Sequence, residues 1–128
     1  NMKISKKALI TMLIAVAALG LYFWYISSSE PQPGQYDDFA KCLSEKNVKM
    51  YGAFWCPHCS NQKKMFGNSW QHIAYIECST SDGRAQTQVC IDRNIEAYPT
   101  WEFGDGNRLT RELTMLDLSR LSGCSLSQ

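Results

Sequence analysis

The hydrophobic positions along the chain divide it into three parts. Residues 8–26 form an apolar run without a charge, which as a helix would extend about 28 Å and match the hydrocarbon thickness of a bilayer. The polar, proline-containing stretch that follows is typical of a linker over residues 27–36. Short apolar segments at helical and strand spacing then continue over residues 37–124, before a short tail over residues 125–128. The pattern predicts one transmembrane helix, a linker and one small globular domain.

The spacing of apolar residues within the domain predicts the element order α-β-α-β-α-β-β-α. Asp37 or Asp38 can cap the first helix, and Thr114, three residues before Asp117, can cap the last. The expected elements are a first helix ending at Asn47, a strand leading into Cys56, a helix over residues 57–66 stopped by Gly67 and Asn68, a strand over 73–78, a short helix over 84–94, a hairpin of 101–103 with 109–113, and a last helix through Leu121.

The charges that flank the apolar run predict its orientation in a membrane. Three lysines lie within residues 1–7, whereas the far side carries Glu30, Asp37 and Asp38. Lysine and arginine are enriched on the cytoplasmic side of membrane helices. Residues 1–7 should therefore be cytoplasmic, and the domain should lie outside the cytoplasm.

A cleaved signal peptide is the alternative interpretation of the same segment. Ala18 and Gly20 form a small-residue pair of the kind that signal peptidases accept. Cleavage there would leave the aromatic cluster of residues 21–25 at a mature N-terminus, whereas in an anchor these rings fit the membrane interface. The aromatic cluster favours the anchor.

The candidate chemistry lies where an apolar, aromatic strand runs into the tetrapeptide Cys56-Pro57-His58-Cys59. Proline is favourable at the first position of a helix, so Pro57 should start a helix whose free N–H groups face the Cys56 sulfur and favour its thiolate. Cys59, one turn further on, is placed to resolve a mixed disulfide formed by Cys56. His58 should add hydrogen bonding and positive charge beside the thiolate, and Trp55 adjoins the reactive sulfur. A stabilised thiolate makes the disulfide oxidising.

Composition narrows the class of protein further. The 128 residues carry 13 basic and 12 acidic side chains, a net charge of +1, so no polycationic surface for nucleic acid is expected. Six cysteines in so short a chain are typical of an oxidising compartment. A Cys-x-x-Cys pair can be half of a zinc site, but eleven residues separate Cys78 from Cys90, where zinc sites have two to four. We therefore expect no bound metal and no cofactor.

The ordered motifs resemble those of the thioredoxin superfamily. The tetrapeptide after Trp55 is followed forty residues after Cys59 by Tyr98-Pro99-Thr100, which is similar to the loop that faces the active-site pair in that superfamily. More narrowly, the chain resembles the thioredoxin-like domain fused to, or partnered with, bacterial vitamin K epoxide reductase homologues. That likeness is carried by residues 51–59, 75–78, Cys90, 98–101 and 121–123.

The resemblance implies an α/β fold of the α+β sandwich type, namely a thioredoxin-like fold that lacks its first edge strand. It also implies a cis bond before Pro99, which would bring Tyr98 and Pro99 against Cys56. The backbone of Tyr98 would then pair with an extended substrate strand. Trp55, Tyr98 and Pro99 are accordingly the expected substrate-binding residues, and Pro57 and His58 join Cys56 and Cys59 in the catalytic motif.

Two positions depart from the pattern of thioredoxins. A buried acidic residue normally precedes the first cysteine by six positions and moves protons to the resolving thiol, but Met50 occupies that position here. Proton transfer should then go through water or His58. A glycine that many relatives carry beside the active site is also absent, and Arg111 and Glu112 lie in that neighbourhood.

The other four cysteines allow several pairings. Cys78 ends a strand and Cys90 lies in the following helix, so we expect a structural disulfide that closes this short loop. Cys42 and Cys124 would then form a second disulfide. The first and last helices of a thioredoxin fold usually cover opposite faces of the sheet, so two buried free thiols are an equal alternative.

The resemblance implies a membrane-anchored, extracytoplasmic thiol-disulfide oxidoreductase of the bacterial cytoplasmic membrane. Its expected activity is that of an oxidase, which passes the Cys56–Cys59 disulfide to cysteine-containing secreted proteins. A separate vitamin K epoxide reductase-like quinone enzyme would reoxidise it. The alternatives are a disulfide reductase or isomerase, including one for cytochrome c maturation, and a non-enzymatic module that binds metal or peptide.

The expected orientation leads to a labelling prediction. A membrane-impermeant thiol reagent should label Cys56 of the reduced protein in intact spheroplasts, because the domain should lie outside the cytoplasm. A Cys56→Ser, Cys59→Ser variant serves as the control for unspecific labelling. Labelling that appears only after lysis would reverse the orientation.

Overall fold

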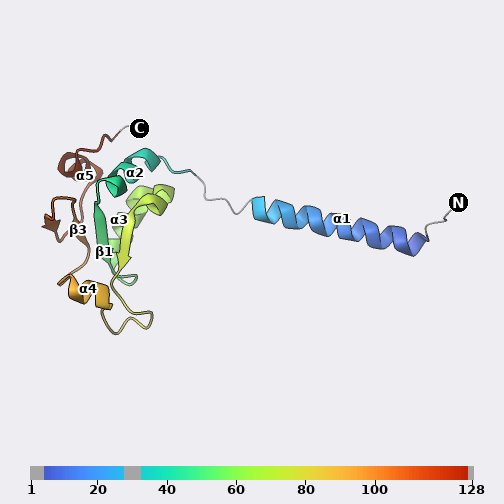
Figure 1. The fold of residues 1–128 in the computed structure, drawn as a ribbon, viewed down its shortest axis with the longest axis horizontal. Helices are drawn as coiled ribbons and strands as arrows, with labels where there is room; N and C mark the ends of the chain where they lie inside the picture. Colours follow the sequence, from blue (N-terminus) through green and yellow to red (C-terminus); the bar gives the residue numbers. More distant parts are fainter. Residues whose placement is uncertain (1–4, 28–32, 127–128) are drawn as a thin grey trace. The chain divides into compact units, whose positions relative to one another are not determined.

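The computed structural model describes residues 5–27 and 33–126, which fall into two compact units that divide near residue 32. The first unit contributes one helix, and the second contains the α/β domain (Figure 1). Lys3 and Glu30, on which the predicted orientation partly rests, lie outside the described residues. So do parts of the expected N-terminal segment, linker and tail.

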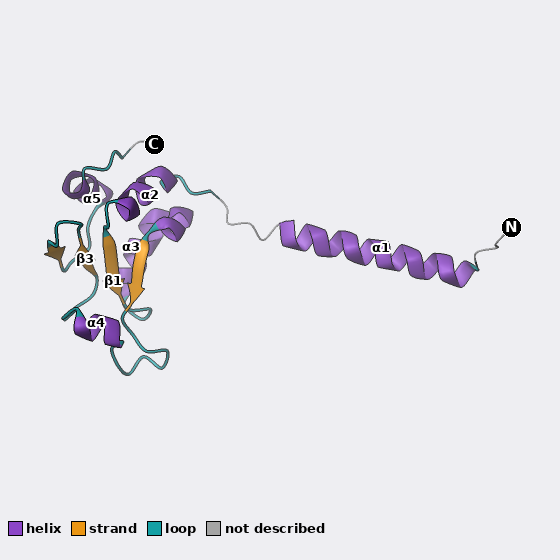
Figure 2. Ribbon diagram, in the orientation of Figure 1, coloured by secondary structure: helices purple, strands orange, loops and turns teal. Residues whose placement is uncertain are grey.

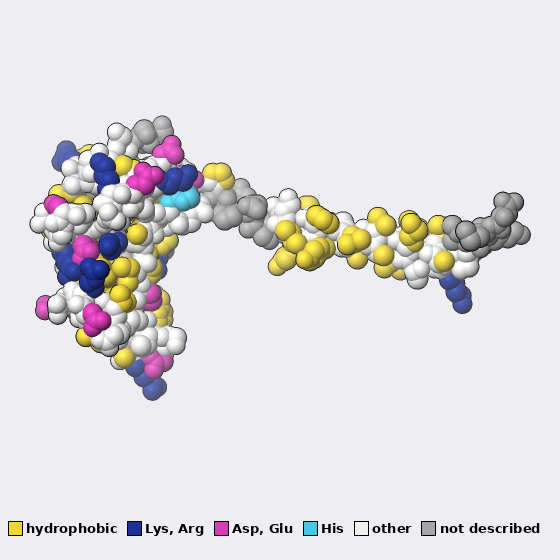
Figure 3. Space-filling model, viewed as in Figure 1, with side chains coloured by type: hydrophobic (Ala, Val, Ile, Leu, Met, Phe, Trp, Pro, Cys, Tyr) yellow, Lys and Arg dark blue, Asp and Glu magenta, His cyan; other side chains and the backbone are white. Residues whose placement is uncertain are grey.

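Helix α1 (Lys6–Ser27) contains the whole apolar run predicted over residues 8–26. Its apolar residues are not confined to one stripe, and none of its side chains is buried. Figure 3 shows exposed hydrophobic side chains along its length. Within residues 5–27 and 33–126 it is the one helix long and apolar enough to cross a membrane. A helix that is apolar all round requires an apolar environment, so the finding is consistent with a single membrane span.

The domain is built on a sheet of four short strands with the order β2-β1-β3-β4 (Figure 2). The central strand β1 pairs in parallel with β2 and antiparallel with β3, which pairs antiparallel with β4. The strands are β1 (Lys49–Gly52), β2 (Ala74–Glu77), β3 (Thr100–Glu102) and β4 (Arg108–Leu109). The helices are α2 (Asp37–Glu45), α3 (Pro57–Phe66), α4 (Gln88–Asp92) and α5 (Met115–Ser122), with a 3₁₀ helix η1 (Gly67–His72) after α3.

This element order is the one predicted from the sequence. No strand precedes β1 in the part of the domain that the structure describes, so the predicted thioredoxin-like fold without its first edge strand is confirmed. The last helix carries the predicted capping box, in which the side chains of Thr114 and Asp117 each accept a bond from the other's backbone N–H. Asp37 and Asp38 lie in the first turn of α2 rather than at its cap, which is Tyr36.

Successive side chains of β1 point to opposite faces of the sheet, as in any strand. Met50 belongs to a large core cluster with Trp101 of β3 and with residues of α2, α3 and α5. Tyr51 packs on the other face in a smaller cluster with Cys78 and Cys90, the latter from α4. The large cluster also contains Phe39, Leu43, Phe66, Leu113 and Leu118. The first and last helices of the domain, α2 and α5, therefore share one core cluster.

Two predicted elements are shorter in the structure, and one element was not predicted. Gly67, with φ +55°, ends α3 as expected, but the chain then continues as the 3₁₀ helix η1. The predicted helix over 84–94 is reduced to α4, because Ser79 and Gln86 form a β-bridge and Thr80 bonds Ala85. The backbone of residues 84–86 therefore forms a bend and a β-bridge, and the helix begins only at Gln88.

The strand predicted over 109–113 also ends early, because a buried glutamine of α3 forms hydrogen bonds with the backbone of Leu113. The Gln62 amide accepts the Leu113 N–H at 3.0 Å and donates to the Leu113 carbonyl at 3.1 Å. Its oxygen also accepts the indole N–H of Trp101 at 2.7 Å. Gln62 is 2% exposed, so these bonds are shielded from water.

Replacing Gln62 by methionine should destabilise the domain by about 2–4 kcal/mol, because the Trp101 indole and the Leu113 backbone would be left buried without partners. Urea unfolding monitored by tryptophan fluorescence measures this. Gln88→Met is the matched control, since the exposed Gln88 side chain bonds Asp92 on the surface of α4, and it should change stability by less than about 0.5 kcal/mol. Equal stability of the two variants would contradict the role of Gln62.

Candidate active site

The site is built at the point where the central strand passes into α3. Cys56 is the N-cap of α3 and Pro57 its first residue, as the sequence predicted. The backbone N–H of Cys59 donates to the Cys56 sulfur at 3.3 Å. The free N–H groups of the first helical turn thus face this sulfur, and they favour a negative charge on it.

The loop before β3 lies against the same sulfur. The Tyr98–Pro99 bond is cis, and the carbonyl oxygen of Tyr98 lies 3.8 Å from Cys56 Sγ. The Trp55 ring packs edge-on against the Tyr98 ring, with centroids 6.0 Å apart. The structure thus brings Trp55, Tyr98 and Pro99 to the redox motif, although their roles toward a substrate stay predictions.

His58 has a partner that the sequence did not indicate. Its Nδ1 lies 2.6 Å from a carboxylate oxygen of Glu112, which also accepts a bond from Asn61 at 3.0 Å. The hydrogen bond from His58, followed by the one from Asn61, holds the pKa of Glu112 below its usual range. Glu112 is 54 positions from His58 in the sequence, so no local pattern could predict this contact.

The side chains around His58 line an open cavity of about 450 Å³. Its walls combine the cis-proline loop with the segment after β4, and they comprise His58, Tyr98, Pro99, Thr110, Arg111 and Glu112. The cavity adjoins the carbonyl that faces Cys56 and offers both charged and apolar surface.

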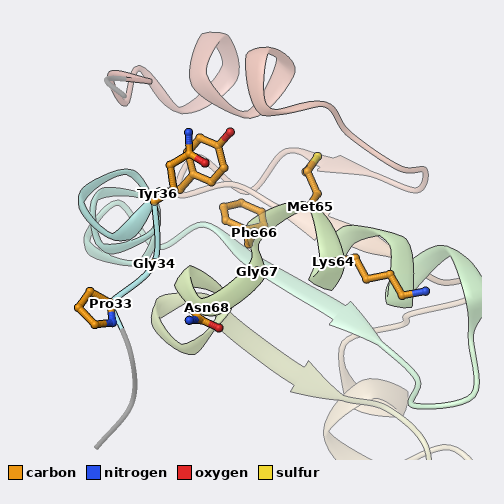
Figure 4. Close-up of a pocket in the computed structure, with 9 residues that line it drawn as sticks. Pro33, Gly34, Tyr36, Lys64, Met65, Phe66, Gly67 and Asn68 are labelled. Atoms are coloured by element: carbon orange, nitrogen blue, oxygen red, sulfur yellow. The ribbon is translucent and has the colours of Figure 1, made fainter.

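A second cavity lies at the start of the domain and is separate in its lining from this site. It measures about 310 Å³ and is bounded by residues such as Pro33, Tyr36 and Met65 (Figure 4). None of its lining residues is a cysteine, a histidine or an acid. Its lining therefore offers no thiol, imidazole or carboxyl group.

The two cysteines of the motif have different surroundings. Cys56 is 5% exposed and Cys59 is fully buried. Burial, followed by the hydrogen bond with Cys56, raises the pKa of the Cys59 thiol to about 12. Cys59 is therefore a protonated thiol at neutral pH, which suits a resolving group that acts second.

The remaining four cysteines form two disulfides. Cys78 is joined to Cys90, so the end of β2 is tied to α4. Cys42 is joined to Cys124, with Cα atoms 6.0 Å apart, which is possible because α2 and α5 share one core cluster. Cys56 and Cys59 are free thiols. In the described ranges, no group of three or more His, Cys, Asp or Glu side chains is arranged to hold a metal.

Fold and site together define a thioredoxin-like domain whose Cys-Pro-His-Cys motif faces a cis-proline loop. No protein-family profile matches the chain. The chain is similar to the thiol-disulfide oxidoreductase LTO1 of Arabidopsis thaliana, with 40% identity over 93 residues. The matched region is 70% of this chain but 24% of that protein, so the chain spans about a quarter of its relative.

The contact between His58 and Glu112 leads to a prediction about redox equilibrium. Glu112→Gln should make the Cys56–Cys59 disulfide more oxidising by a few-fold, because a negative charge in contact with His58 is removed; water screens this exposed pair and keeps the effect small. Equilibration with glutathione buffers measures it. Glu45→Gln on α2 is the control.

His58→Gln should shift the equilibrium in the opposite direction, since it removes a group that stabilises the thiolate. In a His58→Gln background the effect of Glu112→Gln should vanish, because the two residues act through each other. An unchanged effect of Glu112→Gln in that background would show that the carboxylate acts on Cys56 without His58.

Proposed function

We propose that the domain is a thiol-disulfide oxidoreductase that works through Cys56 and Cys59. The observation that carries this is the placement of the Cys56 sulfur, which accepts the Cys59 N–H at the start of α3 and faces the carbonyl of Tyr98. A helix N-terminus favours negative charge on such a sulfur, and a thiol favoured in that way is a good leaving group in disulfide exchange. The similarity to a protein named as a thiol-disulfide oxidoreductase supports the same activity.

The reaction that we propose is oxidation of a substrate dithiol. A substrate thiolate attacks Cys56 Sγ, the Cys56–Cys59 bond breaks, and its electron pair goes to Cys59, which takes up a proton. The second substrate thiolate then attacks the substrate sulfur of the mixed disulfide, and Cys56 leaves as a thiolate. The substrate gains a disulfide and loses two electrons, and the domain ends with one thiolate and one thiol.

In this proposal α1 anchors the chain in a membrane with the domain on the extracytoplasmic side. A separate quinone-reducing enzyme like the vitamin K epoxide reductase homologues would reoxidise Cys56 and Cys59. The apolar α1 and the two disulfides outside the redox motif support the location, since such disulfides persist in oxidising compartments. The substrates would be cysteine-containing proteins that bind as extended chains along the Tyr98 backbone.

A reductase or isomerase is the second candidate, and one contact favours it. The Glu112 carboxylate lies 2.6 Å from His58 and brings a negative charge close to the redox motif. A negative charge near Cys56 means a less stabilised thiolate and a less oxidising disulfide. The redox potential therefore distinguishes the two directions: a value near that of thioredoxin, about −270 mV, would favour the reductase, and a clearly higher value the oxidase.

Trapping of intermediates tests the assignment of the two cysteines. Cys59→Ser should accumulate mixed disulfides between Cys56 and substrate proteins, because no neighbouring thiol can resolve them. Cys56→Ser should trap none, since Cys59 is fully buried. Non-reducing gels of cells that express each variant measure this, and the double serine variant is the control. Trapping by Cys56→Ser alone would reverse the assignment.

A further inference from the structure

The resolving thiol needs a partner for its proton. Cys59 is fully buried, and its pKa of about 12 leaves almost no thiolate at neutral pH. The position from which thioredoxins supply a buried acid holds Met50, which is itself fully buried. His58, the sequence-based candidate, is bonded to Glu112 on the exposed side of the helix. The proton partner must therefore be another group near the Cys59 sulfur.

The phenol of Tyr75 lies beside that sulfur, across the backbone of Gly52. A Cβ atom on Gly52 would lie 2.9 Å from Cys59 Sγ and 3.3 Å from the Tyr75 hydroxyl oxygen. Gly52 pairs with Glu77 and Met50 pairs with Tyr75, so Tyr75 and Glu77 are on the same face of β2. A glycine in a strand often marks such a close approach, and here the sulfur and the hydroxyl border the same space beside Gly52.

The Tyr75 hydroxyl is already bonded to a carboxylate. It donates to one oxygen of Glu77 at 2.8 Å. The other oxygen of Glu77 accepts the backbone N–H groups of Phe54 at 3.1 Å and Ser79 at 3.0 Å, which fixes the carboxylate at the end of β2. Tyr75 and Glu77 are both partly buried, so Glu77 can connect the Tyr75 hydroxyl to solvent.

The charges that face Tyr75 come from two elements. Glu77 lies on its own strand, and Lys63 of α3 places its ammonium group 4.0 Å from the centre of the Tyr75 ring. Cys56 and Cys59 also belong to α3. Burial, then the hydrogen bond to Glu77, raises the pKa of the Tyr75 phenol, so the hydroxyl keeps its proton until a neighbour exchanges one with it.

We propose that the Tyr75 hydroxyl transfers the proton between the Cys59 thiol and the Glu77 carboxylate, with Tyr75 as a catalytic residue and Glu77 as a positioning residue that also leads to water. This inference rests on the proposed oxidoreductase function. When Cys59 attacks a mixed disulfide at Cys56, its proton passes to the Tyr75 oxygen as the Tyr75 proton passes to Glu77, and the bound thiol leaves with the electron pair of the broken bond. In the oxidase direction each transfer runs in reverse.

A chromogenic aromatic disulfide, dithiobis(nitrobenzoate), separates the two steps in the reduced full chain in detergent. Attack by Cys56 releases a first coloured thiolate at a rate that depends on reagent concentration. Attack by Cys59 then releases a second coloured thiolate at a rate that is independent of reagent concentration. Tyr75→Phe should leave the first phase unchanged and slow the second on the order of a hundredfold near neutral pH, the usual contribution of a positioned acid–base group.

The pH profile distinguishes proton transfer from packing. In Tyr75→Phe the second phase should accelerate about tenfold for each pH unit, because hydroxide must then remove the thiol proton directly. The unchanged chain should show a flat profile in the same range and a solvent deuterium isotope effect that Tyr75→Phe alters. Glu77→Gln, which keeps the size of the side chain, should slow the second phase in the same way.

Tyr51→Phe is the matched control, because its hydroxyl bonds Glu102 on the opposite face of the sheet. It should leave both phases unchanged. The proposal would be overturned if the rate of the second phase in Tyr75→Phe equalled that of the unchanged chain. It would also be overturned if only Lys63→Met slowed the second phase. If Tyr75→Phe lowers the thermal midpoint of unfolding, the rate of the second phase in Glu77→Gln tests the proposal instead. Absence of the first phase in the unchanged chain would instead contradict the proposed function itself.

Discussion

The hydrogen bond from the Cys59 backbone to the Cys56 sulfur is the interaction on which the rest of the site depends. It exists because Pro57 starts α3 immediately after Cys56, so that a free N–H of the first helical turn points at the Cys56 sulfur. The helix can begin there only because β1 ends a few residues earlier and its neighbours hold the chain on both sides. A negative charge on that sulfur is stabilised by the backbone alone, before any side chain contributes.

The central position of β1 gives the two sulfur atoms different environments. Through β3, it sets the cis-proline loop beside Cys56, next to an open cavity. Through β2, it sets the partly buried Tyr75 and Glu77 near the fully buried Cys59. Cys56 thus lies against the cis-proline loop, and Cys59 lies near the groups that we propose for its proton.

The two disulfides tie down parts of the domain that do not carry the chemistry. One joins the end of β2 to α4, and the other joins α2 to the segment after α5. In a domain of this size with strands of two to four residues, such crosslinks reduce the conformational freedom of the unfolded chain. Because these four cysteines are paired, Cys56 and Cys59 are the free thiols of the described domain.

The sequence by itself determined the elements and the redox motif, because these depend on local signals. Proline at the start of α3, glycine at its end and the Thr114 capping box each act within a few residues. What the tertiary structure decided involves partners far apart in the chain, such as Glu112 for His58 and the joining of Cys42 to Cys124. Strand pairing and helix packing bring these groups together, and no periodicity in the sequence encodes such contacts.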